Sequence, residues 1–246
     1  MIKNGYLTII LLLLSAGTLF AQERVPAWGG GADLTDLSFG FSFSYVSSYF
    51  KIDKKPNWRD PFFDQGTNKY ITGSLNSISS PNTPGFAVGF ITRYRLTDHL
   101  EVRGNPSLIF SDRSLSYTYD NPAEDVTKQV QATTVDFPLL LKLKSDRINN
   151  FRAYIIGGVK YSLAIGSKKD ADIDADPLDK LVKNAGGFGS YEAGLGCDIY
   201  FEFFKLSPEI KISNSFGNLL VPENQPFSSP INKLGLHTVT FSLIFE

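Results

Sequence analysis

The chain has 246 residues, of which 42% are hydrophobic, 13% aromatic and 20% charged, and its formal net charge is −1. This length fits one domain, and the near-neutral charge gives no indication of nucleic-acid binding. The single cysteine, Cys197, excludes an intramolecular disulfide. Beyond the N-terminal residues, no run approaches the roughly 18 apolar residues that a transmembrane helix needs, so any membrane insertion must use strands.

Residues 1–21 have the pattern of a cleaved signal peptide. Lys3 precedes an apolar core at residues 7–14, and small residues follow before Ala21, where we expect cleavage. Removal of this segment takes away one positive charge and leaves a net charge of about −2. Residues 22–35 would then form a short N-terminal segment ahead of the first strand.

Eight later segments alternate between apolar and polar residues. Residues 37–49 show the pattern best, with Phe39, Phe41 and Phe43 on one face and serines on the other. A period of two is typical of a β-strand. The predicted strands are residues 37–49, 86–94, 100–110, 133–143, 151–163, 190–203, 206–213 and 236–246.

The connections between these strands are alternately long and short, beginning and ending with a long one. Outer-membrane barrels have short periplasmic turns and long extracellular loops. We therefore predict an all-β fold, an eight-stranded antiparallel up-and-down transmembrane β-barrel formed by residues 36–246. It would lie in the outer membrane of a Gram-negative bacterium, in contact with outer-membrane lipid, with both chain ends on the periplasmic side.

The charges gather on one face of the predicted strands. An Arg or Lys facing lipid at the midplane costs about 2–4 kcal/mol, so this face must line the lumen. Eight strands enclose an interior that side chains just fill, and buried charges survive only when they are paired. We predict a plug of ion pairs, with a proton or solute path as the alternative. The predicted network is Arg93, Glu101, Arg103, Asp136, Lys142, Arg152, Lys160, Glu192, Asp198, Glu209 and Lys211.

Three prolines interrupt the predicted strands. Pro106, Pro138 and Pro208 fall inside the third, fourth and seventh strands. A closed barrel has no edge where a missing N–H can face solvent. We therefore expect a bulge or a local break in the hydrogen-bond ladder at each proline.

The sequence contains no catalytic constellation. A barrel lipase or protease would need a histidine at the outer rim beside a serine or carboxylate. His99 lies in a predicted periplasmic turn, and His237 opens the last strand without a nucleophile motif beside it. Cys197 shares the apolar face of its strand, so we interpret it as lipid-facing and not as a reactive thiol. We predict no enzyme activity, no cofactor and no small-molecule substrate.

One predicted extracellular loop is rich in aspartate. Its members are Asp170, Asp172, Asp174, Asp176 and Asp179. A calcium loop needs glycine at its sixth position and glutamate at its twelfth, where this chain has Ala175 and Leu181. We therefore predict no metal site. Asp176 followed by Pro177 suits the start of a short helix instead.

The first long connection carries Trp58, Phe62, Phe63 and Tyr70 among prolines and charges. Exposed aromatic residues often mark contact surfaces, so these four form a candidate partner-contact loop. Internal packing of the loop and anchoring at the membrane interface are the alternatives. The seventh connection, residues 216–227, mixes apolar residues with prolines and raises the same alternatives.

Several ordered stretches, spread over roughly the last 145 residues, resemble those of one known family. They are Asn105-Pro-Ser-Leu-Ile-Phe-Ser-Asp-Arg113, Val135-Asp-Phe-Pro-Leu-Leu-Leu-Lys142, Asn150-Phe-Arg-Ala-Tyr-Ile-Ile-Gly-Gly-Val-Lys160, Tyr191-Glu-Ala-Gly-Leu-Gly-Cys-Asp198 and Leu206-Ser-Pro-Glu-Ile-Lys211. In them the chain resembles the PorT family of outer-membrane barrels of the type IX secretion system, called SprT where the system serves gliding motility. The first loop, residues 51–84, departs from the family pattern.

The resemblance implies an accessory component of type IX protein secretion, with other components of that system as partners. Eight strands cannot pass a polypeptide, so such a protein would act by contact, in assembly or docking, and not as the conducting pore. A general small outer-membrane barrel with an adhesion or membrane-integrity role is the main alternative. A soluble lipocalin-like barrel is a third, and the charged interior argues against it.

Overall fold

The structure is a computed structural model, and it describes residues 33, 35–165, 178 and 182–246. The expected signal peptide, most of the segment that follows it, all five loop aspartates and the predicted helix start lie outside the described residues. In the described ranges, no helix is both long enough and apolar enough to cross a membrane.

Antiparallel strands make up nearly all of the described chain, as predicted. They are β1 (Leu37–Lys54), β2 (Phe63–Asp64), β3 (Lys69–Tyr70), β4 (Leu75–Ser79), β5 (Thr83–Arg95), β6 (Leu100–Gly104), β7 (Ser107–Tyr119), β8 (Val126–Lys144), β9 (Phe151–Ile165), β10 (Gly187–Tyr200), β11 (Lys205–Ser215) and β12 (Ile231–Phe245). A short 3₁₀ turn, η1 (Pro122–Glu124), caps the hairpin between β7 and β8.

The main sheet closes on itself. Neighbouring strands pair from β12 back through β11, β10, β9 and β8, and β1 pairs with both β12 and β5. Strands β6 and β7 each pair with β5 and β8, so they are consecutive parts of one barrel strand. Counted in this way the ring has eight positions. Strand β4 adds to the outer part of β7, and β2 and β3 form a separate hairpin.

The three prolines break the ladder locally without shifting it. Pro106 lies between β6 and β7, and pairing with β8 stops there beside Pro138 and resumes in unchanged register. The Pro106 carbonyl still accepts a hydrogen bond of 3.0 Å from the N–H of Phe90. Pro208 keeps its partner Leu243 on β12, while the ladder to β10 is interrupted. The predicted breaks are confirmed, and they occur without a bulge.

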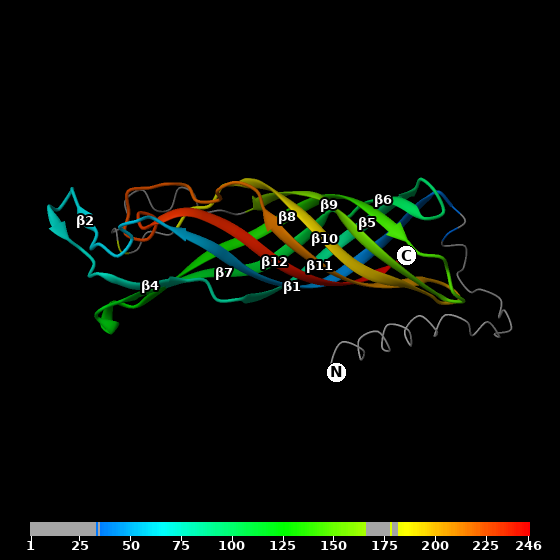
Figure 1. The fold of residues 1–246 in the computed structure, drawn as a ribbon, viewed down its shortest axis with the longest axis horizontal. Helices are drawn as coiled ribbons and strands as arrows, with labels where there is room; N and C mark the ends of the chain where they lie inside the picture. The colour runs from blue at the N-terminus through cyan, green and yellow to red at the C-terminus, as the bar shows by residue number, and fades with distance from the viewer. Residues whose placement is uncertain (1–32, 34, 166–177, 179–181) are drawn as a thin grey trace, which may run out of the picture.

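The strands run further at the loop end than the sequence predicted. Strand β1 continues to Lys54, β7 to Tyr119, and β8 and β12 begin at Val126 and Ile231. Much of what was predicted to be loop is therefore a raised extension of the barrel wall, seen at the left of Figure 1. At the other end the turns are short, and the last strand ends there (Figure 1). The predicted strand 190–203 is also too long there, because β10 ends at Tyr200.

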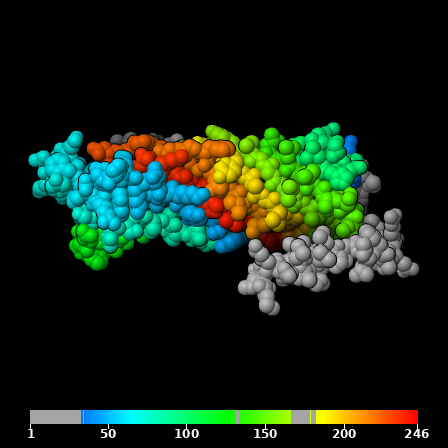
Figure 2. Space-filling view, in the orientation of Figure 1, coloured from blue at the N-terminus to red at the C-terminus, as the bar shows by residue number. Residues whose placement is uncertain are grey.

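An apolar band surrounds the barrel on its outer face. Its exposed residues include Phe39, Phe41, Phe43, Tyr45, Phe86, Phe90, Leu139, Leu141, Ile155, Val159, Leu195, Ile210 and Phe241. Several rings stack across strands, such as Phe41 on Phe245, with 5.3 Å between ring centroids. In the space-filling view the visible face of the wall is continuous as far as the loop end (Figure 2). The half-buried Cys197 lies in phase with this outward face.

A substitution in this band tests whether the outer face of the wall contacts lipid. Leu139 is 61% exposed and lies on the outer face of β8. We expect Leu139→Arg to reduce the free energy of folding into lipid vesicles by about 2–4 kcal/mol, because the guanidinium must enter hydrocarbon. Urea titration of folding, followed by the heat-dependent shift in gel mobility, measures the change.

Tyr70→Arg is the matched control. Tyr70 is 69% exposed on the β2–β3 hairpin, beyond the apolar band. We expect this variant to keep the stability of the parent protein. Equal loss in the two variants would contradict the assignment of Leu139 to the lipid-facing wall.

Candidate functional site: the filled lumen and the extracellular loops

Inward-facing charges fill the periplasmic half of the lumen. Glu101 on β6 lies at the centre of one group, with its Oε1 2.7 Å from Nη1 of Arg93 and its Oε2 3.9 Å from Nζ of Lys142. Lys142 also contacts Asp198 on β10, with 2.7 Å between Nζ and Oδ2. Arg93, Glu101, Lys142 and Asp198 are fully buried. Through these alternating charges the group connects β5, β6, β8 and β10.

A second group crosses the lumen. Nη1 of Arg103 on β6 lies 2.7 Å from Oε2 of Glu209 on β11. The hydroxyl of Tyr154 on β9 donates to the same carboxylate at 2.8 Å. The Arg103 guanidinium lies 5.6 Å from the centroid of the Tyr154 ring. Opposite walls of the barrel are thus held by one carboxylate that accepts from two sides.

A third group lies nearer the loop end. Nζ of Lys160 is 2.9 Å from Asp136 and 3.6 Å from Glu192. Nζ of Lys211 is 3.2 Å from Glu192 and 3.5 Å from Glu209. Lys211 therefore connects this group to the second one through Glu209. Ten of the eleven predicted lumen residues lie in these three groups.

The eleventh residue, Arg152, lies at the periplasmic mouth. Its guanidinium donates to the carbonyl of Ser145 at 2.6 Å and lies 3.7 Å from Asp33. Asp33, ahead of the first strand, also lies 3.2 Å from Arg93 and 3.7 Å from Lys205, and accepts a hydrogen bond from Tyr200. The carboxylate of Asp33 therefore lies among three cations at the mouth.

Five further charged residues face inward beyond those predicted. They are Asp33, Arg113, Lys144, Lys205 and Glu246. Lys144 and Lys205 are in phase with Lys142 and Glu209, but the predicted strands stopped one residue short of them. Glu246 pairs with Lys205 and was assigned no face. For Asp33 no signal was available, because it precedes the alternating segment.

The outer half of the lumen is apolar, which corrects the prediction that ion pairs fill the whole interior. We call its buried cluster the apolar plug; it consists of Phe50, Leu75, Ile78, Leu115, Tyr117, Tyr119, Val130, Val182, Leu219, Leu220, Phe227, Ile231, Leu234 and Leu236. The strand members come from β4 and from the loop ends of β1, β7, β8 and β12. The others come from the long connections, which fold inward between them.

Residues of the seventh connection are anchored inside the plug. Tyr117 donates its hydroxyl to the carbonyl of Phe227 at 2.7 Å, and the two rings meet edge to face at 5.2 Å. Leu219 and Leu220 are 1% and 6% exposed. The apolar residues Leu219, Leu220 and Phe227 of this connection therefore pack internally, whereas Phe216 and Val221 are exposed.

The four aromatic residues of the first loop divide into two pairs. Trp58 is half-buried against the apolar plug, with Nζ of Lys54 4.0 Å from its ring, and Phe62 is also half-buried. Phe63 and Tyr70 are 42% and 69% exposed on the β2–β3 hairpin. Their rings meet at 5.1 Å. Of the four, only the second pair is exposed on the surface.

Both histidines are engaged by neighbouring polar side chains. Nε2 of His99 lies 2.9 Å from Asp146 between two periplasmic turns, and this hydrogen bond lowers the pKa of the Asp146 carboxyl. Nδ1 of His237 lies 2.8 Å from Oδ1 of Asn214. In the part of the chain that the structure describes, no group of three or more His, Cys, Asp or Glu side chains is placed to hold a metal ion.

A family model for the outer membrane protein β-barrel domain matches residues 20–221. The chain belongs to this family. The protein is thus an outer-membrane β-barrel, and the long loops are its extracellular end. No curated protein matches the chain in sequence.

Solved structures similar to this barrel come from small outer-membrane proteins. OprG from Pseudomonas aeruginosa is 15% identical, with a TM-score of 0.41 over 89% of this chain and 95% of that one. Neisserial surface protein A is 7% identical, with a TM-score of 0.44 over 85% of this chain and 98% of that one. AlkL is 12% identical, with a TM-score of 0.40 over 92% of each chain.

The pair of Arg103 and Glu209 tests how the lumen network contributes to stability. We expect Arg103→Met and Glu209→Met each to cost about 3–5 kcal/mol of folding free energy, because each leaves a buried charge without its main partner. The double variant should cost much less than the sum. Urea titration of folding into lipid vesicles gives the four values of the cycle.

The exposed pair of Arg95 and Asp36 is the control for this cycle. Its atoms are 2.9 Å apart, but the two side chains are 26% and 63% exposed. We expect a coupling of about 1 kcal/mol or less between Arg95→Met and Asp36→Met. Additive costs at the buried pair would contradict the linked network.

Proposed function

We propose that this outer-membrane barrel is a non-enzymatic accessory component of type IX protein secretion. It would act by contact, in assembly of the machinery or docking to it, and not as the conducting pore. The class of partner rests on the resemblance of residues 105–211 to the PorT family. Other type IX secretion components would be those partners.

The observation that carries this proposal is the filled lumen. In the periplasmic half, Arg103 and Lys142 are at most 1% exposed, and in the outer half, Leu115 and Leu234 are 0% exposed. Charged side chains thus fill the periplasmic half of the interior, and apolar side chains fill the outer half. A barrel without a passage can influence secretion only through its surfaces.

The β2–β3 hairpin is the surface that we propose for the contact. It extends beyond the rest of the barrel at the loop end (Figure 1) and exposes the paired rings of Phe63 and Tyr70. Beside it a hollow of about 300 Å³ is lined in part by Trp58, Pro226 and Pro230. Exposed aromatic rings next to a concave surface are typical of protein-binding sites.

A general small barrel with an adhesion or membrane-integrity role is the second candidate, and one observation favours it. The stretches that carry the PorT resemblance lie in β7 to β11 and in the turns between them, where they supply inward charges such as Asp136, Glu192 and Glu209. Residues that fill a lumen are needed for the fold, whatever partner the protein binds. Shared stretches of this kind support a common architecture as well as a common partner.

Deletion in the native host separates the two candidates. Under the secretion proposal, secreted cargo disappears from the culture supernatant and accumulates in the periplasm, and the intact gene restores secretion. Proteomic comparison of the two fractions measures this. Unchanged secretion would contradict the proposal and leave the general barrel.

Complementation with variants tests the hairpin. We expect Phe63→Ser with Tyr70→Ser to fold normally but to restore secretion poorly, because the exposed rings are lost. Phe203→Ser is the control, since Phe203 is 86% exposed in the periplasmic turn between β10 and β11. Full secretion with the hairpin variant, at equal levels in the membrane, would exclude this contact surface.

A further inference from the structure

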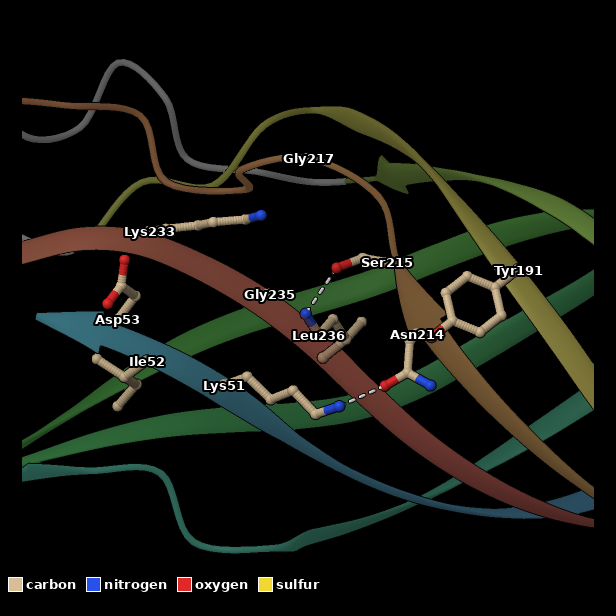
Figure 3. A pocket seen from close by; sticks show the side chains of 10 residues that line it. All are labelled: Lys51, Ile52, Asp53, Tyr191, Asn214, Ser215, Gly217, Lys233, Gly235 and Leu236. Atoms are coloured by element: carbon tan, nitrogen blue, oxygen red, sulfur yellow. Dashed lines mark hydrogen bonds between the residues drawn. The ribbon is translucent and has the colours of Figure 1, made fainter.

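A hollow of about 320 Å³ lies on the outer wall of the barrel, where β1, β12, β11 and β10 approach the loop end. Its lining includes Lys51, Asp53, Tyr191, Asn214 and Lys233, and Figure 3 shows these side chains around β12. Gly235 forms part of the lining, and no atom lies closer than 3.7 Å to the position that its Cβ would occupy. The hollow exists because this outward position of β12 carries no side chain.

The hollow sits where the wall changes from apolar to charged. On β1 the outward residues run from Phe43 and Tyr45 through Tyr49 to Lys51. On β12 they run from Phe241 through His237 to Lys233. Aromatic residues mark the level of the lipid headgroups in outer-membrane barrels. The two lysines therefore lie at the headgroup level of the outer leaflet.

The charges of the hollow are incompletely compensated. Nζ of Lys51 donates to Oδ1 of Asn214 at 2.7 Å, which is a neutral partner. Lys233 lies opposite Asp53 in register, yet Asp53 accepts its side-chain hydrogen bond from Asn232, at 2.8 Å. Among the described residues, neither lysine forms an ion pair with a carboxylate. Two ammonium groups thus face a hollow that holds one carboxylate.

Side chains next to Lys51 hold Asn214 in place. Nδ1 of His237 also lies 2.8 Å from Oδ1 of Asn214, and the His237 ring lies against Tyr49 with 5.0 Å between centroids. The Asn214 oxygen is therefore occupied from two sides, which leaves its amide nitrogen as a donor. Figure 3 shows both lysine side chains extending along the wall toward Asn214 and Ser215. The hollow is therefore lined by donors from three strands, Lys51 on β1, Asn214 on β11 and Lys233 on β12.

We propose that this hollow binds the phosphate group of an anionic glycolipid in the outer leaflet of the membrane. Lysine ammonium groups bind phosphate as point charges, and basic side chains at the membrane surface attract anionic lipids. The apolar wall directly below, with Tyr191 and Ile212, offers contact to the acyl chains of the same lipid. This combination of phosphate donors above acyl-chain contacts selects a lipid over a soluble anion. The inference does not depend on the secretion role.

Lipid binding by the purified full-length barrel in nonionic detergent tests this. The probes are a bisphosphorylated lipid A, the same glycolipid with both phosphates removed, and inorganic phosphate, each followed by native mass spectrometry and by competition. We expect the bisphosphorylated lipid to bind and the dephosphorylated lipid to bind about tenfold more weakly or worse. Inorganic phosphate at the same concentration should not displace the lipid.

Three double variants make the test specific. Lys51→Gln with Lys233→Gln should weaken binding of the bisphosphorylated lipid about tenfold, and Lys51→Arg with Lys233→Arg should retain it. Lys55→Gln with Lys69→Gln removes the same charge from exposed loop residues and should change binding by less than about twofold.

Equal binding by the Gln pair and its control would overturn the proposal, as would equal binding of the dephosphorylated lipid. Displacement by inorganic phosphate would show a site for a free anion and would overturn the assignment to a lipid.

Discussion

Closure of the sheet is the constraint on which the rest of this structure depends. Within a bilayer every backbone N–H and C=O must be paired inside the protein, so the first and last strands have to meet. Here β1 pairs with β12 on one side and with β5 on the other. Closure fixes which residues face inward and which face lipid along every strand. The register therefore passes Pro106, Pro138 and Pro208 unchanged, because a slip of one residue would turn the charges of a strand toward hydrocarbon.

Charged side chains fill one half of the lumen and apolar side chains fill the other. The medium around the outer face of the wall, lipid or water, explains this change. Inside the bilayer the outer face is apolar, so a polar inner face gives each strand a defined orientation. Lys142 is tolerated there because Asp198 lies 2.7 Å away. Above the bilayer the outer face meets water, and the inner face becomes apolar, as in a soluble protein. Leu234 and Phe227 fill that part, and the loops that supply such residues are held in the interior.

This inversion also decides what the sequence could predict. Alternation and connection lengths predicted the eight barrel positions and the facing of Glu101 and Arg103, because apolar-out and polar-in is a distinctive pattern. The raised wall was predicted as loop, since its outward residues are polar and its apolar inward residues, such as Leu115 and Leu234, lay outside the predicted strands. Asp33 could not be found at all, because its role depends on where the mouth of the closed barrel places it.

Ion conductance across a planar bilayer tests the central claim, that side chains fill the lumen in both halves. Purified full-length protein, inserted at a known number of copies, should give no steady conductance above that of the bare membrane, because the charged network and the apolar plug lie in series. A large open barrel inserted under the same conditions shows that insertion is detected. Steady, voltage-independent conductance by the unmodified protein would contradict the filled lumen and return a solute path to consideration.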